Sequence, residues 1–542
     1  MKKFLTLIFA AITLFSVACS KSGTSAPAPA VTPAPVATTA PAAAAGPLSA
    51  STNIVSSKDS MMVIMIGDTS SFDPADNVGQ NRFQTLRHIF ETVVEYDQNG
   101  QLVPWLAESW SYPNDLTLQL NLRHGVKFNN GDDLKASDVL FTFKRLIDDN
   151  TPAAMQVSMV DFNKSSCPDD YTVVLVTTDP YAMQLAMLEN PLCGIISEKA
   201  YKASGGGRQF GNSQQPVGTG PYMLVSHTVG DSTVLKANPN YWIKGQPYVK
   251  NLTIRYIGDQ TARLTEAMAG NADIVYDIGA TDIATIKKDT NINLISKLGA
   301  NTSILTFNQA TKPLDNIKVR EAIFYAVDIP AAVKVAYGTD FGGIAYSYIS
   351  PNIDGYDPTM EALSPKQDLA RAKQCLVDAG FPNGFSTSIS CMNTDQARQA
   401  MCEAIQAQLA LVGIKCAVDV QDSGSWNTNL AAGKGVLSIY GFTASTGEAA
   451  RNLFRWLPDK SEWPIFSWKS QEYYDVINKA LITTDHTERN KLFAQCQQLL
   501  MKNYVGLPVW NNELNAACKL NVQGFWIQPA YQQHMLQFVY FK

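Results

Sequence analysis

Histidine and charge are both sparse in this chain of 542 residues. Five histidines occur, at positions 88, 124, 227, 486 and 534, and no two have the spacing of a metal-binding pair. Charged residues make up 17% of the chain, the net charge is −5, and no basic block or basic-aromatic stripe is present. We therefore expect no metal site, no cofactor and no nucleic-acid partner.

Catalytic motifs are missing as well. The sequence contains no GxSxG elbow, no HExxH, no phosphate loop with GK followed by Ser or Thr, and no dinucleotide fingerprint. These absences favour a protein that binds its ligand without transforming it. A pocket hydrolase of the glycosidase type stays open as an alternative, because the two carboxylates of such enzymes have no diagnostic spacing.

Long apolar runs are lacking except at the N-terminus, where Lys2 and Lys3 precede the apolar residues 4–15. This layout is typical of a secretory signal peptide, which we assign to residues 1–18. Cys19 follows small residues and resembles the lipidated cysteine of a bacterial lipobox, although Ser16 stands where that motif usually has Leu. We expect a lipid anchor in the cell envelope, on the periplasmic or extracytoplasmic face. Release as a free secreted protein is the alternative.

Residues 20–47 are almost entirely Ala, Pro, Ser and Thr, with no apolar period that could bury a face. Residues 19–57 are therefore predicted to be the lipidated cysteine and a semi-rigid tether. Close to 490 residues follow, enough for two or three packed units. The eight further cysteines of this body are either disulfides or buried thiols, and spacing alone does not decide between them.

Apolar periodicity predicts strands and helices that alternate along the body. Residues 61–66 have the length of a strand, and residues 83–94 carry apolar side chains at helical spacing. Leucines alternate strictly over residues 116–122, as in a half-buried strand, and residues 136–147 again follow a helical period. The body is therefore expected to mix both kinds of element.

A βαβ unit is predicted further on, with strands at residues 386–391 and 414–420 and a helix at residues 394–411. Gly413 is placed just past the helix, where glycine commonly ends one. Such units build parallel sheet covered by helices, so the fold class is α/β.

Four separated stretches resemble bacterial extracellular solute-binding proteins of family 5, the oligopeptide, dipeptide and nickel type. Their order and spacing match that family over nearly the whole body. The stretches are Leu106-Ala107-Glu108-Ser109-Trp110 with residues 122–131 and 136–141; Pro216-Val217-Gly218-Thr219-Gly220-Pro221-Tyr222 with residues 238–242; Phe307-Asn308 with Pro313, Asp315 and residues 319–322; and a C-terminal helix that ends at Leu507-Pro508-Val509-Trp510.

The resemblance implies a two-lobed periplasmic-binding-protein fold, the Venus flytrap, hinged by strands that cross between lobes. Lobe I would comprise residues 58–300 and 506–542, with residues 91–216 as a subdomain inserted in it, and lobe II would comprise residues 301–505. The implied function is capture of a peptide-like or other small organic solute in the inter-lobe cleft and delivery to an ABC permease with its ATPase. The chain would act as a monomer. A sensory or adhesion lipoprotein on the same scaffold is the alternative.

The family motifs also have structural interpretations. Asn130-Gly131 and residues 218–221 carry turn-forming residues. Arg320, near a helix start, is expected to make a contact that holds the fold.

The loop at residues 444–449 is predicted to help select the ligand. In peptide-binding relatives, the loop after the strand that corresponds to residues 438–443 carries an aspartate that pairs with the peptide's α-ammonium. Ser445 stands at that position here, and a buried ammonium without a carboxylate partner is costly. The resemblance therefore argues against ordinary peptide capture, unless Glu448 takes the role of the aspartate.

Aromatic side chains with a few polar groups are expected to line the cleft, as in many ligand pockets. Arg451 is included because a guanidinium suits a carboxylate on the solute. For each aromatic residue, a place in the core is the alternative. The predicted ligand-binding residues are Phe72, Trp426, Tyr440, Phe442, Ser445, Glu448, Arg451, Trp456 and Trp510.

Overall fold

The fold is given by a computed structural model. All described residues belong to Ala40–Lys542, the second of two compact units. The predicted signal peptide, Cys19 and most of the linker lie outside them. Among these residues no helix combines the length and the apolar composition that a membrane crossing requires. The structure describes residues 54–69, 71–76, 84–213, 215–279, 282–338, 343–393, 395–444, 447–457, 468–528 and 535–542.

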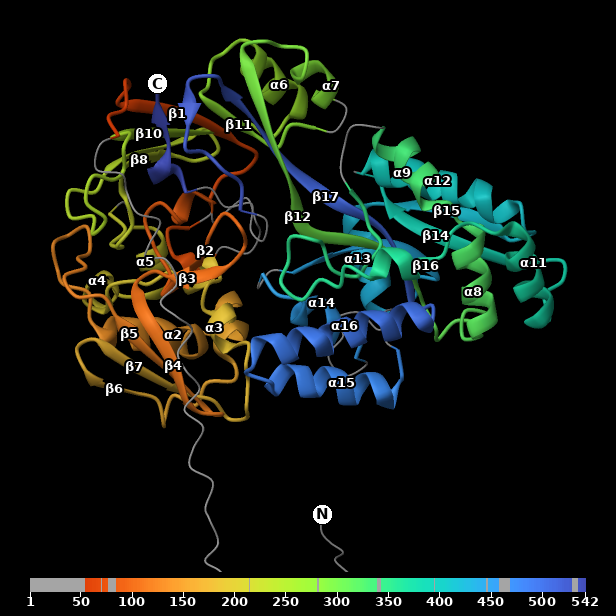
Figure 1. The fold of residues 1–542 in the computed structure, drawn as a ribbon. Coiled ribbons are helices and arrows are strands. Elements are labelled where there is room, and N and C mark those ends of the chain that lie inside the picture. The colour runs from red at the N-terminus through yellow and green to blue at the C-terminus, as the bar shows by residue number, and fades with distance from the viewer. Residues whose placement is uncertain are drawn as a thin grey trace, which may run out of the picture. The chain divides into compact units, whose positions relative to one another are not determined.

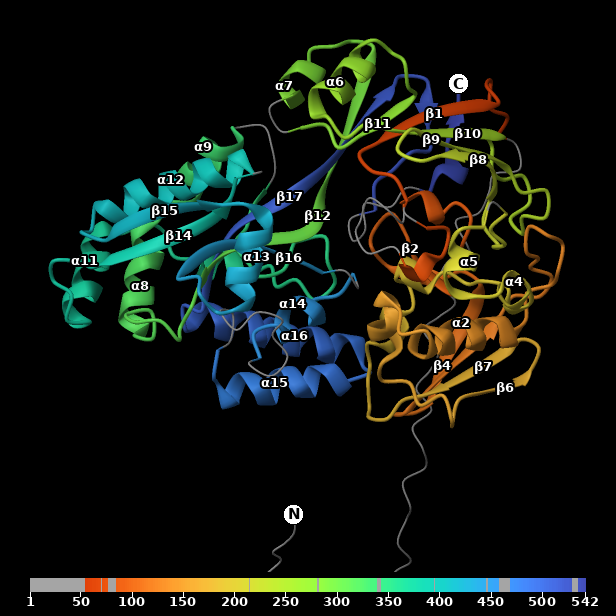
Figure 2. The same cartoon turned by 180° about the vertical axis from the view of Figure 1, so that it is seen from behind.

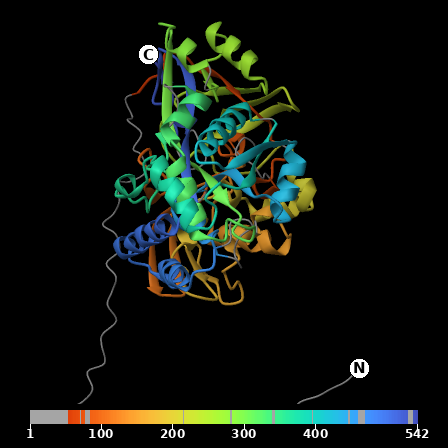
Figure 3. The same cartoon turned by 90° about the vertical axis from the view of Figure 1, so that its right-hand side faces the viewer.

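An eleven-stranded sheet runs through these residues, in the order β15-β14-β16-β12-β17-β11-β1-β10-β9-β8, with β13 (Gly343–Ile344) paired to β17. Its two long central strands, β12 (Ile292–Phe307) and β17 (Gly506–Lys519), lie side by side and pair antiparallel (Figure 1, Figure 2 and Figure 3). Each of them crosses from one half of the sheet to the other. They are therefore the strands shared by both halves.

The half that contains β1 mixes parallel and antiparallel pairs. β1 (Ser60–Met65) confirms the strand predicted near residues 61–66 and pairs in parallel with β10 and β11. Its buried face joins an apolar cluster that includes Val63, Leu235 and Ile254. The other elements of this half are β8 (Tyr222–Thr228), β9 (Ser232–Ala237), β10 (Asn251–Tyr256), α6 (Gln260–Met268), β11 (Ile274–Tyr276), α7 (Ile283–Ile286), β18 (Val522–Gln523) and β19 (Tyr540–Phe541).

The other half contains the predicted βαβ unit, which the structure confirms. β14 (Ser386–Met392) and β15 (Lys415–Gln421) pair in parallel, and α12 (Gln396–Ala410) connects them. Gly413 follows the helix with φ +89°. The other elements here are α8 (Ile317–Ala326), α9 (Ile329–Tyr337), α10 (Met360–Leu363), α11 (Leu369–Asp378), α13 (Ser423–Ala431), β16 (Leu437–Thr443), α14 (Ala450–Phe454), α15 (Gln471–Ile482) and α16 (His486–Lys502).

A smaller, four-stranded sheet has the order β4-β5-β7-β6. Its strands come from the part of the chain between β1 and β8, and together with α2 they enclose a separate apolar core. β5 (Thr117–Leu122) and α2 (Ala136–Asp148) confirm the strand and the helix predicted for this stretch. The remaining elements are β2 (Val94–Tyr96), β3 (Leu102–Pro104), β4 (Ala107–Asn114), β6 (Ser166–Asp169), β7 (Thr172–Val176), α3 (Gln184–Met187), α4 (Glu198–Ser204), α5 (Gly207–Gly211) and the short 3-10 helices Pro74–Asp76, Pro152–Val157, Pro191–Cys193 and Leu536–Phe538.

The prediction of a helix over residues 83–94 is wrong, since among the described residues 84–94 only 84–86 are helical and the segment ends in β2. Its apolar side chains are buried all the same, with Ile89 and Val93 fully inaccessible. The carbonyl groups accept bonds from other segments: that of Ile89 from the Gly220 amide at 2.8 Å, and that of Glu91 from the Ile195 amide at 2.8 Å. Tertiary partners therefore replace the i to i−4 ladder of a helix.

The C-terminal helix does not extend to residues 507–510 as predicted. α16 ends at Lys502, and those residues belong to β17, where Leu507 pairs with Leu305. Arg320 makes the expected fold-holding contact: its guanidinium donates to the carbonyl oxygens of Leu314 at 2.8 Å and Tyr504 at 3.1 Å. This arginine therefore ties the start of α8 to the segment between α16 and β17.

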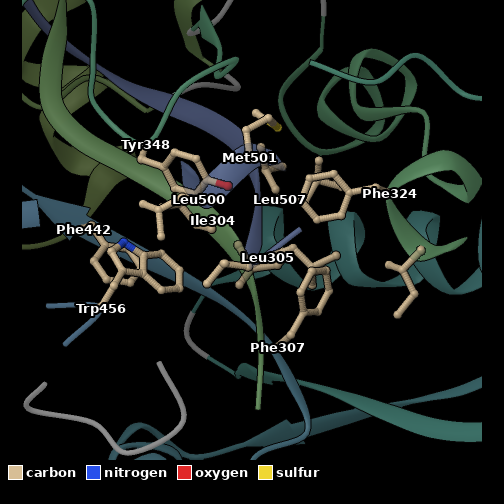
Figure 4. Packing of buried hydrophobic residues seen from close by; sticks show 14 of the residues in the cluster. Ile304, Leu305, Phe307, Phe324, Tyr348, Phe442, Trp456, Leu500, Met501 and Leu507 are labelled. Carbon is tan, nitrogen blue, oxygen red and sulfur yellow. The ribbon is translucent and has the colours of Figure 1, made fainter. Parts of the chain in front are cut away.

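The cysteines of the body are free thiols in the structure. All eight from Cys167 to Cys518 are described; seven are buried and Cys167 is half-buried. In the half that contains β14, the apolar core brings together β12, β16, β17 and the surrounding helices (Figure 4).

Candidate ligand-binding region

The loop after β16 starts beside the shared strands. β16 pairs with β12 on one side and β14 on the other, so its end reaches the crossing point of the sheet. The Ala444 amide donates to the Ala300 carbonyl at 3.1 Å, and the Ala449 amide donates to the Asp354 carbonyl at 2.8 Å. Both ends of the loop are therefore fixed. Ser445 lies outside the described residues, so its predicted role stays a prediction.

Four of the predicted aromatic residues form one continuous row. Trp426 stacks on Tyr440 with ring centroids 5.8 Å apart, Tyr440 meets Phe442 edge-on at 5.3 Å, and Phe442 stacks on Trp456 at 5.4 Å. Tyr440 and Phe442 share a face because they are two residues apart on β16. Trp426, Phe442 and Trp456 are at most 2% exposed, whereas Tyr440 is half-buried. Tyr440 therefore presents the most accessible surface of the row, and Figure 4 shows Phe442 and Trp456 inside the core.

Phe72 and Trp510 lie elsewhere. Phe72 is 4% exposed in the apolar cluster around β1 and meets His227 edge-on at 5.3 Å. Trp510, on β17, is 8% exposed and stacks on Tyr337 of α9 with ring centroids 4.2 Å apart. The structure thus brings four of the six predicted aromatics together and places the other two in separate contacts.

Gly447 is in close contact with Tyr96 of β2. Its φ is +69°, and a Cβ atom at this position would lie 2.3 Å from the Tyr96 ring. Only glycine satisfies both the left-handed backbone and the close approach. The loop after β16 and the segment around β2, about 350 residues earlier in the chain, are therefore in direct contact.

Glu448 is 8% exposed and lies where several distant segments meet. Its Oε1 is 3.6 Å from Nη2 of Arg489 in α16. Its charge also acts on the phenols of Tyr112 in β4 and Tyr181 ahead of α3. We call Tyr112, Tyr181, Glu448 and Arg489, together with Asp354, the Glu448 joint. A backbone bond from the Ala182 amide to the Leu481 carbonyl, 3.0 Å long, adjoins it.

Burial dominates the electrostatics of the joint. Desolvation raises the pKa of Glu448 to about 7, and the Arg489 guanidinium offsets only part of that rise. Burial would also raise the pKa of Asp354, but hydrogen bonds from His486 at 2.7 Å and from Asn490 hold it below its usual value. The same contact raises the pKa of His486. The joint therefore holds one carboxylate, Asp354, whose pKa is set by its hydrogen bonds, and one carboxyl group, Glu448, whose pKa is set mainly by burial.

Arg451 and Arg455 follow on the next helical turn. Nη1 of Arg451 is 3.6 Å from the Met155 sulfur, and the Arg455 guanidinium is 6.0 Å from the Phe442 ring centroid. Both side chains are half-buried. Arg455 therefore adjoins the row of aromatics, whereas Arg451 reaches Met155 in the 3-10 helix Pro152–Val157. A guanidinium group suits recognition of a carboxylate.

Sequence reasoning found Glu448 and Arg451 but missed most of their neighbours. Tyr96, Tyr112 and Tyr181 come from a part of the chain more than 250 residues away, and no periodicity relates them to the loop. Arg455 could have been found, because it lies four residues after Arg451 and so on the same face of a helix.

The region offers surfaces that suit the binding of a small molecule. It combines stacked rings, guanidinium groups and buried carboxyl groups. Among the residues that the structure describes, no group of three or more His, Cys, Asp or Glu side chains could hold a metal ion.

A two-lobed α/β body with two strands shared by its halves and an aromatic, cationic region at their crossing is the architecture of a periplasmic solute-binding protein. Residues 101–462 match the family model described as bacterial extracellular solute-binding proteins, family 5 Middle, and the chain belongs to this family. The fold and family predicted from the sequence are therefore confirmed.

Individual relatives agree with this assignment. The glutathione-binding protein GsiB of Escherichia coli K12 is 29% identical over 484 residues, which cover 86% of this chain and 92% of GsiB. The ABC transporter-associated periplasmic binding protein DppA of Helicobacter pylori, solved in complex with the peptide STSA, superposes with a TM-score of 0.71 at 24% identity, covering 89% of this chain and 98% of DppA. The murein tripeptide-binding protein MppA in its unliganded open form gives 0.79 at 18% identity, with 90% and 98% covered.

Proposed function

We propose that this protein is the solute-binding component of an ABC importer, which captures a peptide-like solute between its lobes and delivers it to a membrane permease. The observation that carries the proposal is the pair of shared strands, β12 and β17, which join two separately cored halves. The lobe boundaries predicted from the sequence, including the subdomain at residues 91–216, are part of this proposal. The core clusters support them, since one cluster draws almost all its residues from 300–510.

Lobe closure would occur by bending at the shared strands. The β12–β17 ladder is irregular between Leu298 and Thr302 and again between Ser303 and Ile304. Such irregularities bend strands locally, so they are natural points of flexure. A ligand would then drive closure through its higher affinity for the closed state.

The solute we favour is glutathione or a similar γ-glutamyl peptide. GsiB, a relative over most of both chains, is named for binding glutathione. An ordinary peptide presents a lone ammonium group, whereas the ammonium group of a γ-glutamyl residue has a carboxylate on the same carbon. A site with Ser445 in place of the expected aspartate would suit such an end, and Arg451 or Arg455 would suit a carboxylate of the solute.

Two isomeric peptides test this proposal. Calorimetry with γ-Glu-Cys-Gly and α-Glu-Cys-Gly, which have the same atoms and net charge, should show at least tenfold tighter binding of the γ isomer, or about 1.4 kcal/mol. Equal affinities, or tighter binding of the α isomer, would contradict the choice of solute. Arg451→Gln should weaken binding about tenfold if a guanidinium–carboxylate pair is lost. Arg371→Gln is the matched control, because Arg371 pairs with Glu321 and stacks on Tyr325.

Closure is tested independently of affinity. Saturating ligand should reduce the radius of gyration in solution scattering and raise the melting temperature, because a ligand that binds only the folded clamp stabilises it. Binding without compaction would contradict the clamp mechanism and leave the binding role intact.

Anchoring at Cys19 is the remaining element of the proposal. Labelled palmitate should enter the wild-type chain and not the Cys19→Ala variant, while the urea unfolding curve of the folded body stays unchanged. A wild-type chain that never takes up the label would refute the lipoprotein assignment.

A further inference from the structure

The segment around α3, residues 181–188, takes part in two apolar cores at once. Met183 and Ala186 are 1% and 2% exposed, and they pack in the cluster whose other buried residues come from 300–510. Leu185 and Leu188 pack in the separate core of the four-stranded sheet. Residues three apart lie on one face of a helical turn, so the two pairs occupy opposite faces. The α3 segment, as we call residues 181–188, therefore lies between the two cores.

A backbone hydrogen bond joins the α3 segment to α15. The Ala182 amide donates to the Leu481 carbonyl at 3.0 Å, and Figure 1 shows α3 beside α15. The side chains of Tyr181 and Leu481 pack against the same cluster that contains Met183. Apolar side chains and a backbone bond thus connect the α3 segment to the predicted lobe II.

Buried ion pairs hold the inserted subdomain to the predicted lobe I. Glu189, the residue after the α3 segment, lies 2.6 Å from Arg87, and their side chains are 0% and 8% exposed. Arg145 of α2 pairs with both carboxylate oxygens of Asp73, at 2.7 and 2.8 Å. Separating buried pairs is costly, because each charge then lacks a partner in the interior. The subdomain and its α3 segment are therefore expected to move with the predicted lobe I.

We propose that the α3 segment is a latch, which is anchored on the predicted lobe I and enters the core of the predicted lobe II when the clamp closes. The inference rests on the clamp of the proposed function and not on the choice of solute. Opening would withdraw Met183 and Ala186 from that core and expose them to water, while the ion pairs stay intact. Because this apolar burial exists only in the closed clamp, the latch favours closure with or without a solute.

Two alanine variants on opposite faces of the α3 segment test the latch. Met183→Ala removes a side chain from the core of the predicted lobe II. Leu185→Ala is the matched control, because it removes a buried side chain from the subdomain core instead. In solution scattering without added solute, Met183→Ala should have a larger radius of gyration than the wild type, and Leu185→Ala should not. An increase in neither variant, in Leu185→Ala alone, or to the same extent in both would overturn the proposal.

A cross-link at the backbone contact gives a test that leaves both cores intact. Ala182→Cys combined with Leu481→Cys places two thiols where the backbones meet, and oxidation should join them in most molecules. Added to Met183→Ala, the cross-link should return the radius of gyration to the wild-type value, and reduction should release it. Thiols that do not pair in the folded double variant would overturn the proposal, even if Met183→Ala fails to fold.

Affinity separates the latch from the choice of solute. Met183→Ala should weaken the binding of γ-Glu-Cys-Gly and α-Glu-Cys-Gly by the same factor, about tenfold, because the burial that it removes favours closure around either peptide. Leu185→Ala should weaken neither. Unchanged affinity of Met183→Ala for a peptide that the wild type binds would overturn the latch and leave the choice of solute standing. Equal affinities of the wild type for the two isomers would contradict the choice of solute and leave the latch standing.

Discussion

Two buried glutamates show how differently this protein holds a carboxyl group within one core and at a meeting point of segments distant in sequence. Glu91 is 4% exposed and Glu448 is 8% exposed, and burial raises the pKa of each to about 7. Glu91 accepts hydrogen bonds from four neutral donors at 2.9 to 3.0 Å: the indoles of Trp105 and Trp242 and the hydroxyl groups of Tyr241 and Thr219. Glu448 has a guanidinium at 3.6 Å and lies between segments remote in sequence.

The two carboxyl groups differ in how firmly their contacts hold them and in the role that this gives them. Four donors directed at one acceptor fix Glu91 in place, and the three connecting segments that supply the donors are fixed with it. At Glu448 the guanidinium of Arg489 lies 3.6 Å away, a longer contact than any of the four at Glu91. A carboxyl group can therefore serve as a rigid centre inside the predicted lobe I and as an adjustable contact where that lobe meets the predicted lobe II.

The largest effect is expected from removing the rigid centre. Glu91→Ala would leave four buried donors without their acceptor, at a cost of about 4 kcal/mol in the free energy of unfolding. Urea denaturation monitored by tryptophan fluorescence measures it. Glu91→Gln keeps one acceptor oxygen and should lose less. A loss below about 1 kcal/mol for Glu91→Ala would show that the donors find other partners.

The next largest effect is expected at the loop beside the joint. Gly447→Ala places a Cβ atom against the Tyr96 ring and in a left-handed backbone conformation, so we expect a loss of about 2 kcal/mol. Adding Tyr96→Ala to Gly447→Ala separates the two causes. If the double variant loses no less than the sum of the single variants, the ring contact contributes nothing and the strain lies in the backbone alone.

The smallest effect is expected at the joint itself and depends on pH. Because the pKa of Glu448 in the folded protein is about 7, above its usual 4.5, wild-type stability decreases as pH rises through this window. Glu448→Gln removes that penalty, so it should match the wild type near pH 4.5 and exceed it by about 1 kcal/mol at pH 8. Urea midpoints across this range measure the difference.

Glu488→Gln is the matched control for this prediction. Glu488 is on α16 beside Arg489, but its side chain is 48% exposed and pairs with Lys491. A variant at this position should follow the wild-type pH dependence. If Glu448→Gln also follows it, the carboxyl group at the joint is not the source of the pH dependence.

The sequence was informative where interactions are local. The βαβ unit at β14, α12 and β15 could be predicted because its apolar periods and Gly413 act over a few residues. The helix expected over residues 83–94 failed because Gly220 and Ile195, distant in sequence, bind its carbonyl groups. The family motifs identified the scaffold, but the Glu448 joint could not be foreseen, since Tyr112 and Tyr181 reach it through tertiary folding alone.

The shared strands have a mechanical consequence. β12 and β17 are bonded along nearly their whole lengths, so together they behave as a flat ribbon that bends readily across its face and resists shear within its plane. In the proposed clamp, the easiest motion of one lobe would be a swing about the irregular stretch from Leu298 to Ile304. The proposed lobes would then open and close along the same path. Tyr440 and Arg451 would approach the facing lobe in the same alignment at each closure.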